Sequence, residues 1–541
     1  MTQPPPGQPG PPPGYGSPQS GYGQPQAGYG QQPPPQPGYG QPQSGYGQPQ
    51  APGGYAQAGG SYPQQSPVQQ PQRSRRGLKI AAAGAAGVIG LGAVAGGGAF
   101  AWSMLSGGGP QPEEALPGDT VAFAKVDLDP SADQKVDALR FFSKFPDADV
   151  DADGDPKKEI FEALQEDGGL QGVDYAQDVE PWLGDRIGMG VLPSTDGGEP
   201  EVVLALAVTD TGAAEDSVDA LTAGGQSACG VDEDFMICGE EQSVVDRVTG
   251  ASDSLAESDT FSDDMDALGE DGVATAWMDQ GKVSELAQQS SSTSSVPPVE
   301  ATGRTAMALR FDGPTVELFA KVTGTEGAQL GDQSPSVGQL PEDTLGALGA
   351  SGMGDALTER WSDIESTLKP TVGDQAWQDG LSDLQAETGL SVPDDISAAL
   401  GNDTVLAVGG KNANGEPNVA VRTDGERSAL DKLVGASARS ATPLVIASGA
   451  DSRHAVGIDQ KYADTVANGD GLGDTERYQD AVPDADDAQI IGYLDIEQLV
   501  ATYGDEMTEE DRRAAEALSS AGMTVSSTDD GAEIRMRLTT R

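Results

Sequence analysis

The first 72 residues of this 541-residue chain contain no Asp, Glu, Lys or Arg. They are mainly Pro, Gly, Gln, Ser, Ala and Tyr, and Gly-Tyr-Gly recurs around Tyr15, Tyr22 and Tyr29. Such a segment cannot bury enough apolar surface to offset the entropy lost on ordering, so we expect residues 1–72 to be a disordered tail with polyproline character. Two roles stay open for it. One is a solvated spacer, which low complexity favours; the other is tyrosine-mediated self-association or docking to a proline-binding partner.

Cysteine and histidine are almost absent, with two and one in the whole chain. Two cysteines exclude a disulfide-dense scaffold, and a zinc site would need further ligands. Cys229 and Cys238 flank a predicted hairpin turn at Glu233-Asp234, so we expect a disulfide in an oxidising compartment; two buried free thiols are the alternative. The single His454 stands in a polar context without a nucleophile motif, which gives no support to a Ser-His-Asp hydrolase.

Phosphate-binding motifs are also missing, because neither a Walker A sequence nor GxGxxG occurs. The chain has 86 acidic and 31 basic residues, and its formal net charge of -55 excludes a nucleic-acid partner. Asp127 and Asp129 could form an acid–base pair for glycoside cleavage, but chance pairs are expected in so acidic a chain. We predict no catalytic residue, no cofactor and no enzymatic activity; a carboxylate-based hydrolase stays as an alternative.

One acidic stretch resembles half of a calcium loop. Asp149, Asp151 and Asp153 occupy positions one, three and five, and Gly154 follows at position six. Position twelve is Ile160, where a bidentate carboxylate is required. We interpret the stretch as a solvated loop and keep its three aspartates as calcium candidates; no other metal site is predicted.

Residues 80–105 form a long run without charge, rich in Ala and Gly. A helix of this length exceeds the roughly 30 Å hydrocarbon core of a bilayer, so we predict a transmembrane helix. A cleaved signal peptide and a buried soluble helix were weighed and fit less well, because the run is too long and too rich in glycine. Four basic residues, Arg73, Arg75, Arg76 and Lys79, lie in the juxtamembrane segment 73–79 just before the run, and none lies within 15 residues after it. This asymmetry predicts a single-pass plasma-membrane protein with a cytoplasmic N-terminus and an extracellular C-terminal domain.

Beyond a linker at 106–115 the sequence repeats itself at a spacing of about 217 residues, which predicts two similar halves at 116–328 and 329–541. The matched segments, in the same order in both halves, are Leu116–Thr120 with Leu340–Thr344, Gly172–Gly184 with Gly389–Gly401, Asp259-Thr260 with Asp474-Thr475, Trp277–Asp279 with Tyr493–Asp495 and Arg310–Gly313 with Thr528–Gly531. We expect an α+β ectodomain in which each half is an antiparallel sheet covered by helices.

Periodicity places the same elements in each half. Apolar residues at every third position predict a helix in each half. In the first half they are Val136, Leu139, Phe142 and Phe145, after the capping residue Ser131. In the second half they are Trp361, Ile364 and Leu368. A short helix should end at Leu183-Gly184 and at Leu400-Gly401. Alternation predicts strands at 186–192, 202–209, 273–278, 305–311 and 315–322, and again at 404–408, 418–422, 489–494, 523–527 and 533–538, the last with its charged residues on a wet face.

The stretch Leu116–Ser131, followed by Lys135 and Phe141-Phe142, resembles a family of actinobacterial membrane proteins. The family's exported domain is of unknown function, and the resemblance implies the same layout of tail, membrane helix and outer domain. It implies no activity, ligand or catalytic residue. Three hypotheses follow: binding or scaffolding at the cell envelope with an envelope protein as partner, carriage of an apolar ligand in a pocket within or between the halves, and an undetected hydrolase.

Overall fold

The computed structural model describes residues 109–145, 157–158, 161–162, 165, 173–195, 199–223, 227–270, 272–290, 302–325, 330–438, 442–450 and 452–541. These residues all belong to the second of two units, Met1–Gln72 and Arg73–Arg541. The predicted tail, basic segment, membrane helix and calcium candidates therefore lie outside the described residues. Within the described ranges, no helix combines the length and the apolar character that a membrane span requires.

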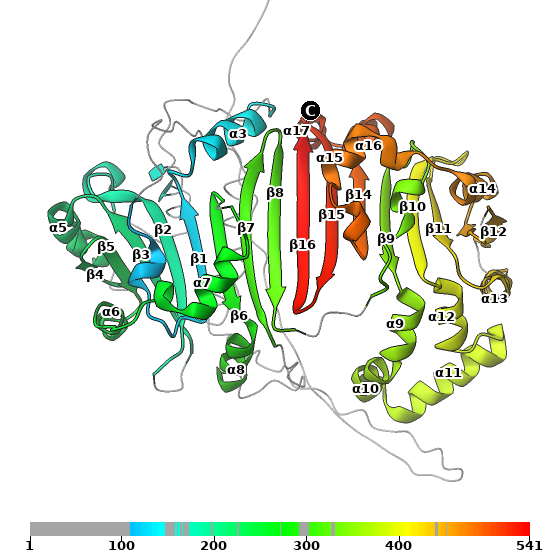
Figure 1. The fold of residues 1–541 in the computed structure, drawn as a ribbon, viewed down its shortest axis with the longest axis horizontal. Helices are drawn as coiled ribbons and strands as arrows, with labels where there is room; N and C mark the ends of the chain where they lie inside the picture. Colours follow the sequence, from blue (N-terminus) through cyan, green and yellow to red (C-terminus); the bar gives the residue numbers. More distant parts are fainter. Residues whose placement is uncertain are drawn as a thin grey trace, which may run out of the picture. The chain divides into compact units, whose positions relative to one another are not determined.

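Sixteen strands of the described chain form one antiparallel sheet (Figure 1). In the first half they are β1 (Ala122–Asp127), β2 (Leu183–Leu192), β3 (Glu201–Val208), β4 (Ala228–Asp232), β5 (Phe235–Gly239), β6 (Ala274–Asp279), β7 (Arg304–Asp312) and β8 (Thr315–Thr323). In the second half they are β9 (Gly346–Ser351), β10 (Asp403–Lys411), β11 (Pro417–Thr423), β12 (Val445–Ser448), β13 (His454–Gly457), β14 (Ile490–Asp495), β15 (Leu518–Thr528) and β16 (Gly531–Thr540).

The two sets of eight strands follow the same spatial order. From one edge to the centre the first half runs β4-β5-β3-β2-β1-β6-β7-β8, and from the other edge the second runs β12-β13-β11-β10-β9-β14-β15-β16. Strands β8 and β16 pair antiparallel at the centre, where Phe319 lies opposite Arg535. The α+β class with an antiparallel sheet is confirmed. The expectation of one sheet per half is wrong, because pairing of β8 with β16 removes an exposed edge from each half.

The Leu-Pro-x-Asp-Thr segments form the same turn in both halves. The Thr120 hydroxyl donates to the carbonyl of Pro117 at 2.7 Å, and the Thr344 hydroxyl donates to that of Pro341 at 2.7 Å. Two of the other predicted matches are displaced by two residues. In the structure the capping hydroxyl of Ser258 corresponds to that of Thr475. The β7–β8 turn, between Asp312 and Thr315, corresponds to the β15–β16 turn, between Thr528 and Gly531.

One face of the sheet, here called the core face, carries the two largest apolar clusters. In the first half α2 (Pro112–Ala115), α6 (Gln242–Thr249) and α7 (Asp259–Asp266) supply side chains to it, and in the second half α14 (Gln460–Asn468) and α15 (Glu476–Ala481) do so. Phe261 packs edge-on to Trp277 with centroids 5.5 Å apart, and Tyr478 packs on Tyr493 at 5.2 Å in the corresponding place.

The opposite face, here called the second face, is covered in patches. Helix α3 (Ala132–Phe142) packs on β7, and α5 (Thr211–Thr222) lies over β4 and β5. Helices α12 (Asp394–Leu400) and α13 (Arg427–Ser437) pack beside β12 and β13. Further α-helices of the described residues are α8 (Gln280–Ser290), α9 (Met353–Glu359), α10 (Trp361–Val372), α11 (Asp374–Thr388), α16 (Ile496–Tyr503) and α17 (Glu509–Glu516).

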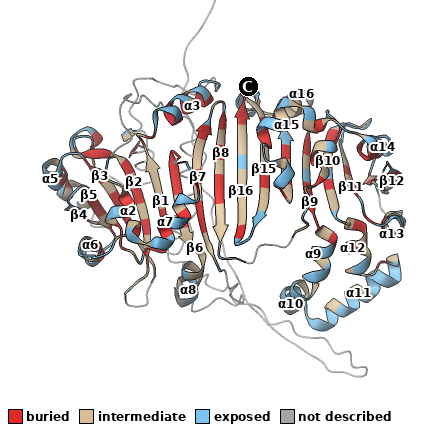
Figure 2. Ribbon diagram, viewed as in Figure 1, coloured by how far each residue is buried: buried red, intermediate tan, exposed pale blue. Residues whose placement is uncertain are grey.

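Three predictions from periodicity are wrong in detail. Ser131 does cap α3, but the helix buries Ala138, Phe141 and Phe142 and leaves Val136 43% exposed, because its contacts are set by β7. Helix α10 buries none of its residues (Figure 2), since it packs on α11 instead of on a sheet. The segment Leu183-Gly184 belongs to strand β2, whereas Gly401 does cap α12, at a positive φ of 63°.

Strand β16 also reverses its predicted faces. Its charged side chains lie on the core face, where Arg535 and Arg537 reach the buried Glu317 of β8. Met536, on the second face, is 45% exposed. Alternation predicted the two sides of the strand correctly, but it could not show which side other elements would cover.

Candidate functional site

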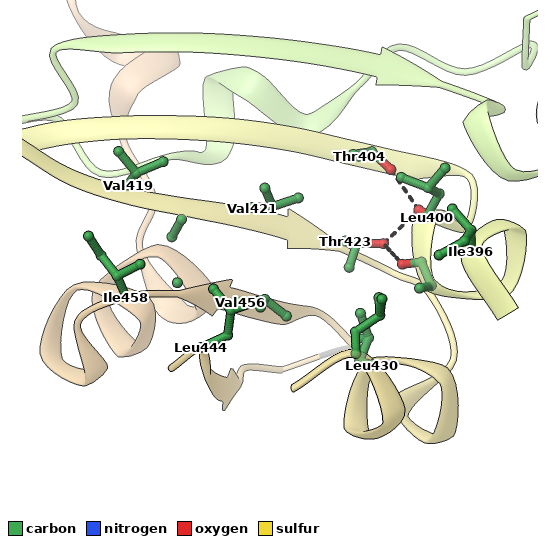
Figure 3. A pocket seen from close by; sticks show the side chains of 14 residues that line it. Ile396, Leu400, Thr404, Val419, Val421, Thr423, Leu430, Leu444, Val456 and Ile458 are labelled. Carbon is green, nitrogen blue, oxygen red and sulfur yellow. Dashed lines mark hydrogen bonds between the residues drawn. The ribbon is translucent and has the colours of Figure 1, made fainter. Parts of the chain in front are cut away.

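An apolar pocket lies on the second face of the second half, between α12, α13 and strands β10, β11 and β13. Its volume is about 300 Å³. Side chains from all five elements and from the adjoining loops converge on it (Figure 3), among them Ile396, Leu400, Val419, Val421, Leu430, Leu433, Leu444, Val456 and Ile458. No charged residue is among those that line it.

The two hydroxyls in the wall are engaged within the protein. Thr404 donates to the carbonyl of Leu400 at 2.6 Å. Thr423 lies within 2.6 Å of the same carbonyl and 3.0 Å of that of Ala399, and it accepts from the Gly425 amide at 2.9 Å. These contacts satisfy the last carbonyls of α12 and fasten that helix to the sheet. The surface left to a ligand is therefore almost entirely hydrocarbon.

The corresponding place in the first half is filled. Trp182, which aligns with Ala399 in the Gly172–Gly184 and Gly389–Gly401 match, is 0% exposed and packs with Phe161 and Tyr175. Its Nε1 donates to the Asp178 carbonyl at 2.7 Å, which satisfies its polar atom. Aromatic side chains thus occupy in one half the position that a single methyl group leaves open in the other.

The predicted disulfide is confirmed, and it lies at the outer edge of the first half, close to Trp182. Cys229 on β4 and Cys238 on β5 are bonded across the hairpin, and Glu233 in its turn takes a φ of 50°. The strand registers place Ile446 and Val456 at the equivalent positions of the second half. Val456 lines the pocket, so an aliphatic pair replaces the disulfide beside it.

The two carboxylates considered as an acid–base pair are both engaged in ion pairs. Asp127 pairs with Arg186 at 2.9 Å and Asp129 pairs with Lys135, so both carboxylates neutralise bases. Among the described residues no group of His, Cys, Asp and Glu could hold a metal ion. Asp149, Asp151 and Asp153 lie outside the described residues.

His454 faces Ser448 across the β12–β13 pair, with Nδ1 3.1 Å from the hydroxyl. Burial, with a smaller contribution from the Arg427 charge, lowers the pKa of His454, so the imidazole is neutral at pH 7. Arg427 also donates to the Ser448 hydroxyl at 2.8 Å. These side chains form a polar group where β12 ends and β13 begins.

Two buried charge clusters were not predicted. Glu317 accepts from Arg310 at 2.8 Å and, across the β8–β16 junction, from Arg535 and Arg537 at 3.3 Å each. Arg422 is 0% exposed, and its guanidinium donates to the carbonyls of Gln339 and Ser336. Burial lowers the pKa of Arg422 to about 10. Both clusters fix segments that join the halves, so we interpret them as structural.

One difference between the two matched segments indicates the pocket. The two matched thirteen-residue segments are equal in length, and the Trp182–Ala399 difference is the largest change of side-chain volume between them. Within a duplicated fold, a large-to-small difference at a buried position predicts a cavity unless a neighbour fills it. The neighbours that could have filled it come from α13 and β13, which the sequence alone does not bring together.

Among solved structures, one titled "Structure of crystal form I of TP0453" is 7% identical, with 41% of this chain and 82% of that chain covered. Its TM-score is 0.20, too low to support an argument about this fold. No curated protein matches the chain. Residues 83–230, which end within strand β4, match the family described as "Protein of unknown function (DUF3352)".

Proposed function

We propose that this chain is a membrane-anchored binding protein of the cell envelope whose second half holds an apolar ligand in the α12–α13 pocket. The observation that carries the proposal is a pocket of about 300 Å³ whose wall hydroxyls are already bonded to α12. Such a site gives a ligand no charged partner inside, and binding would be driven by removal of apolar surface from water.

The size of the pocket fits part of an alkyl chain or a small ring system. A cavity of about half this volume, when lined by Leu, Ile and Phe side chains, stays dry and binds benzene. A buried methylene contributes about 0.8 kcal/mol, so even a short chain segment would bind measurably. We infer that the expected apolar-carrier function is the one that this geometry supports best.

The test uses the full chain in lipid nanodiscs and a photoreactive long-chain alcohol as probe. Labelled peptides should contain residues 396–404, 419–423, 430–433 or 456–458. Ala399→Trp, which copies the first half, should abolish this labelling, and Val421→Phe should reduce it. Leu384→Trp, at a 38% exposed position on α11, is the control. Equal labelling of Ala399→Trp and wild type would contradict the proposal.

Partner binding is a second candidate, supported by the second face of the sheet. Alternation and the strand registers place only uncharged residues on that face of β1, β6–β9 and β14–β16, all within the described chain. Leu348 is 49% exposed there, Met536 45% and Leu494 38%. An exposed apolar surface on so acidic a protein favours a partner protein with a complementary apolar surface.

Crosslinking in intact cells tests this candidate. Leu348→Glu and Met536→Glu should each remove a crosslinked band, while Leu384→Glu on α11 should leave it unchanged. A pattern of bands identical in all three variants would contradict partner binding through this face. Protease added to intact cells tests the proposed orientation, because it should digest residues 106–541 and spare the tail.

A further inference from the structure

One end of the pocket lies beside the polar side chains of Ser448 and His454, which are on the second face of the sheet, as the pocket is. Thr423 lines the pocket and pairs with His454 in the β11–β13 register, and His454 pairs with Ser448 in the β12–β13 register. Facing positions in neighbouring strands present their side chains to the same side. Ser448 and His454 therefore continue the second face beyond the apolar wall.

Helix α13 contributes to the same end of the pocket. Its Leu430 lines the pocket. Arg427 precedes Leu430 by about one helical turn, and Asp431 directly follows it. Arg427 Nη1 donates to Ser448 at 2.8 Å, which ties the start of the helix to β12. Arg427, Asp431, Ser448 and His454 are here called the polar rim.

The chemistry of the polar rim favours a ligand head that accepts hydrogen bonds. The Arg427 guanidinium has five N–H donors. Its Nε donates to Asp431 at 2.8 Å and its Nη1 to Ser448, and among the described residues Nη2 has no partner. The neutral imidazole of His454 and the hydroxyl of Ser448 are bonded to each other, which leaves one N–H or O–H between them to donate to a ligand head without adding charge.

We propose that the pocket takes an amphiphile with an apolar chain and a monoanionic carboxylate head, with the chain between α12 and α13 and the head at Arg427 and Ser448. This inference rests on the proposed function. Asp431 already neutralises Arg427, so the rim carries no net charge of its own. A phosphate dianion would be repelled by Asp431 more strongly than a carboxylate, which one guanidinium can bind with two parallel hydrogen bonds.

The two arginines Arg427 and Arg512 give a matched pair of variants. Each forms an exposed ion pair four residues along its helix, with Asp431 at 2.8 Å and with Glu516 at 3.1 Å. Their side chains are 46% and 42% exposed, so neither substitution should disturb the core. Only Arg427 stands beside the pocket.

The experiment measures how dodecanoate and dodecanol displace the photoreactive alcohol from the full chain in nanodiscs. Arg427→Gln should weaken displacement by dodecanoate about fivefold, the loss expected for one half-exposed charged hydrogen bond. Displacement by dodecanol should stay unchanged in that variant, and Arg512→Gln should change neither. Dodecyl phosphate should compete less well than dodecanoate.

Two results would overturn the inference, and only the second would also overturn the proposed apolar site. If the probe labels the pocket but Arg427→Gln binds dodecanoate as wild type does, the head assignment is wrong and the apolar site stands. If the probe does not label the pocket in wild type, the proposed function fails together with the inference.

Discussion

The two halves of the sheet have the same strand order, but a site that is filled by side chains in the first half is a cavity in the second. In both halves, a strand hairpin forms the outer edge of the sheet and helices pack against the second face there. In the first half Trp182 fills the space, and in the second half Ala399 leaves a pocket of about 300 Å³. Strand order is insensitive to this exchange because it is fixed by backbone pairing, whereas the cavity depends on side-chain volume.

The hairpins at the outer edges differ in a related way. The first half joins β4 and β5 through Cys229–Cys238, and the second half has Ile446 opposite Val456. A covalent bond fixes one edge, while apolar packing alone holds the other. The half with the filled site is thus also the half whose edge is fixed by a covalent bond.

Removal of the filling side chain should have the largest effect. Trp182→Ala should destabilise the folded chain by about 3–5 kcal/mol, because it leaves a large cavity among Phe161, Tyr175 and Met236. Urea denaturation followed by circular dichroism measures the change. Trp361→Ala is the control, since α10 buries none of its residues and the loss there should stay below about 1 kcal/mol. Equal losses would mean that Trp182 does not fill a core.

The junction between the halves should be nearly as sensitive. Glu317→Gln leaves Arg310, Arg535 and Arg537 beside a neutral group at a site where Glu317 is 3% exposed. We expect a cost of about 3 kcal/mol, the usual result of breaking a buried ion pair from one side. Glu533→Gln, which removes the more exposed Lys321 pair, should cost less than about 1 kcal/mol. Thermal unfolding distinguishes the two, and a mild effect at Glu317 would show that the junction does not depend on its charge.

The disulfide should contribute about 2–3 kcal/mol, the chain-entropy value for a loop with a sequence separation of 9. The double change Cys229→Ala with Cys238→Ala should lose this amount in urea denaturation. Cys229→Ile with Cys238→Val copies the second half and should recover part of it through apolar packing. If the copy were no more stable than the alanine pair, the two edges would not be interchangeable.

A smaller effect should appear in acid. Burial tends to raise the pKa of Asp264, but hydrogen bonds from Arg304, Trp277 and Thr323 outweigh it, so the pKa lies below the ordinary value of an aspartate. A carboxyl with a lowered folded pKa adds stability above its unfolded pKa, and this stability is lost as pH falls through the folded value. Below about pH 4, wild type should therefore lose stability more steeply than Asp264→Asn. Glu516→Gln, on exposed α17, should keep the wild-type slope, and parallel slopes for wild type and Asp264→Asn would remove this role of Asp264.

The sequence by itself determined part of the local structure of the described chain. Alternation located ten of its sixteen strands but not β1, β9, β12 or β13. The spacing of Cys229 and Cys238 predicted the bonded hairpin, and Ser131 marked the start of α3. These features depend on neighbouring residues, so periodicity and turn chemistry suffice. The Leu-Pro-x-Asp-Thr segments were matched in the sequence as a repeat, and both form the same turn in the structure.

Only the tertiary structure decided which faces are covered. The pairing of β8 with β16 turned the two halves into one sheet and buried Glu317 among arginines from both. The pocket likewise needed α13 and β13 to stand beside Ala399. Alternation divides a strand into two faces, but burial of either face depends on elements far away in the chain, and no local pattern carries that information.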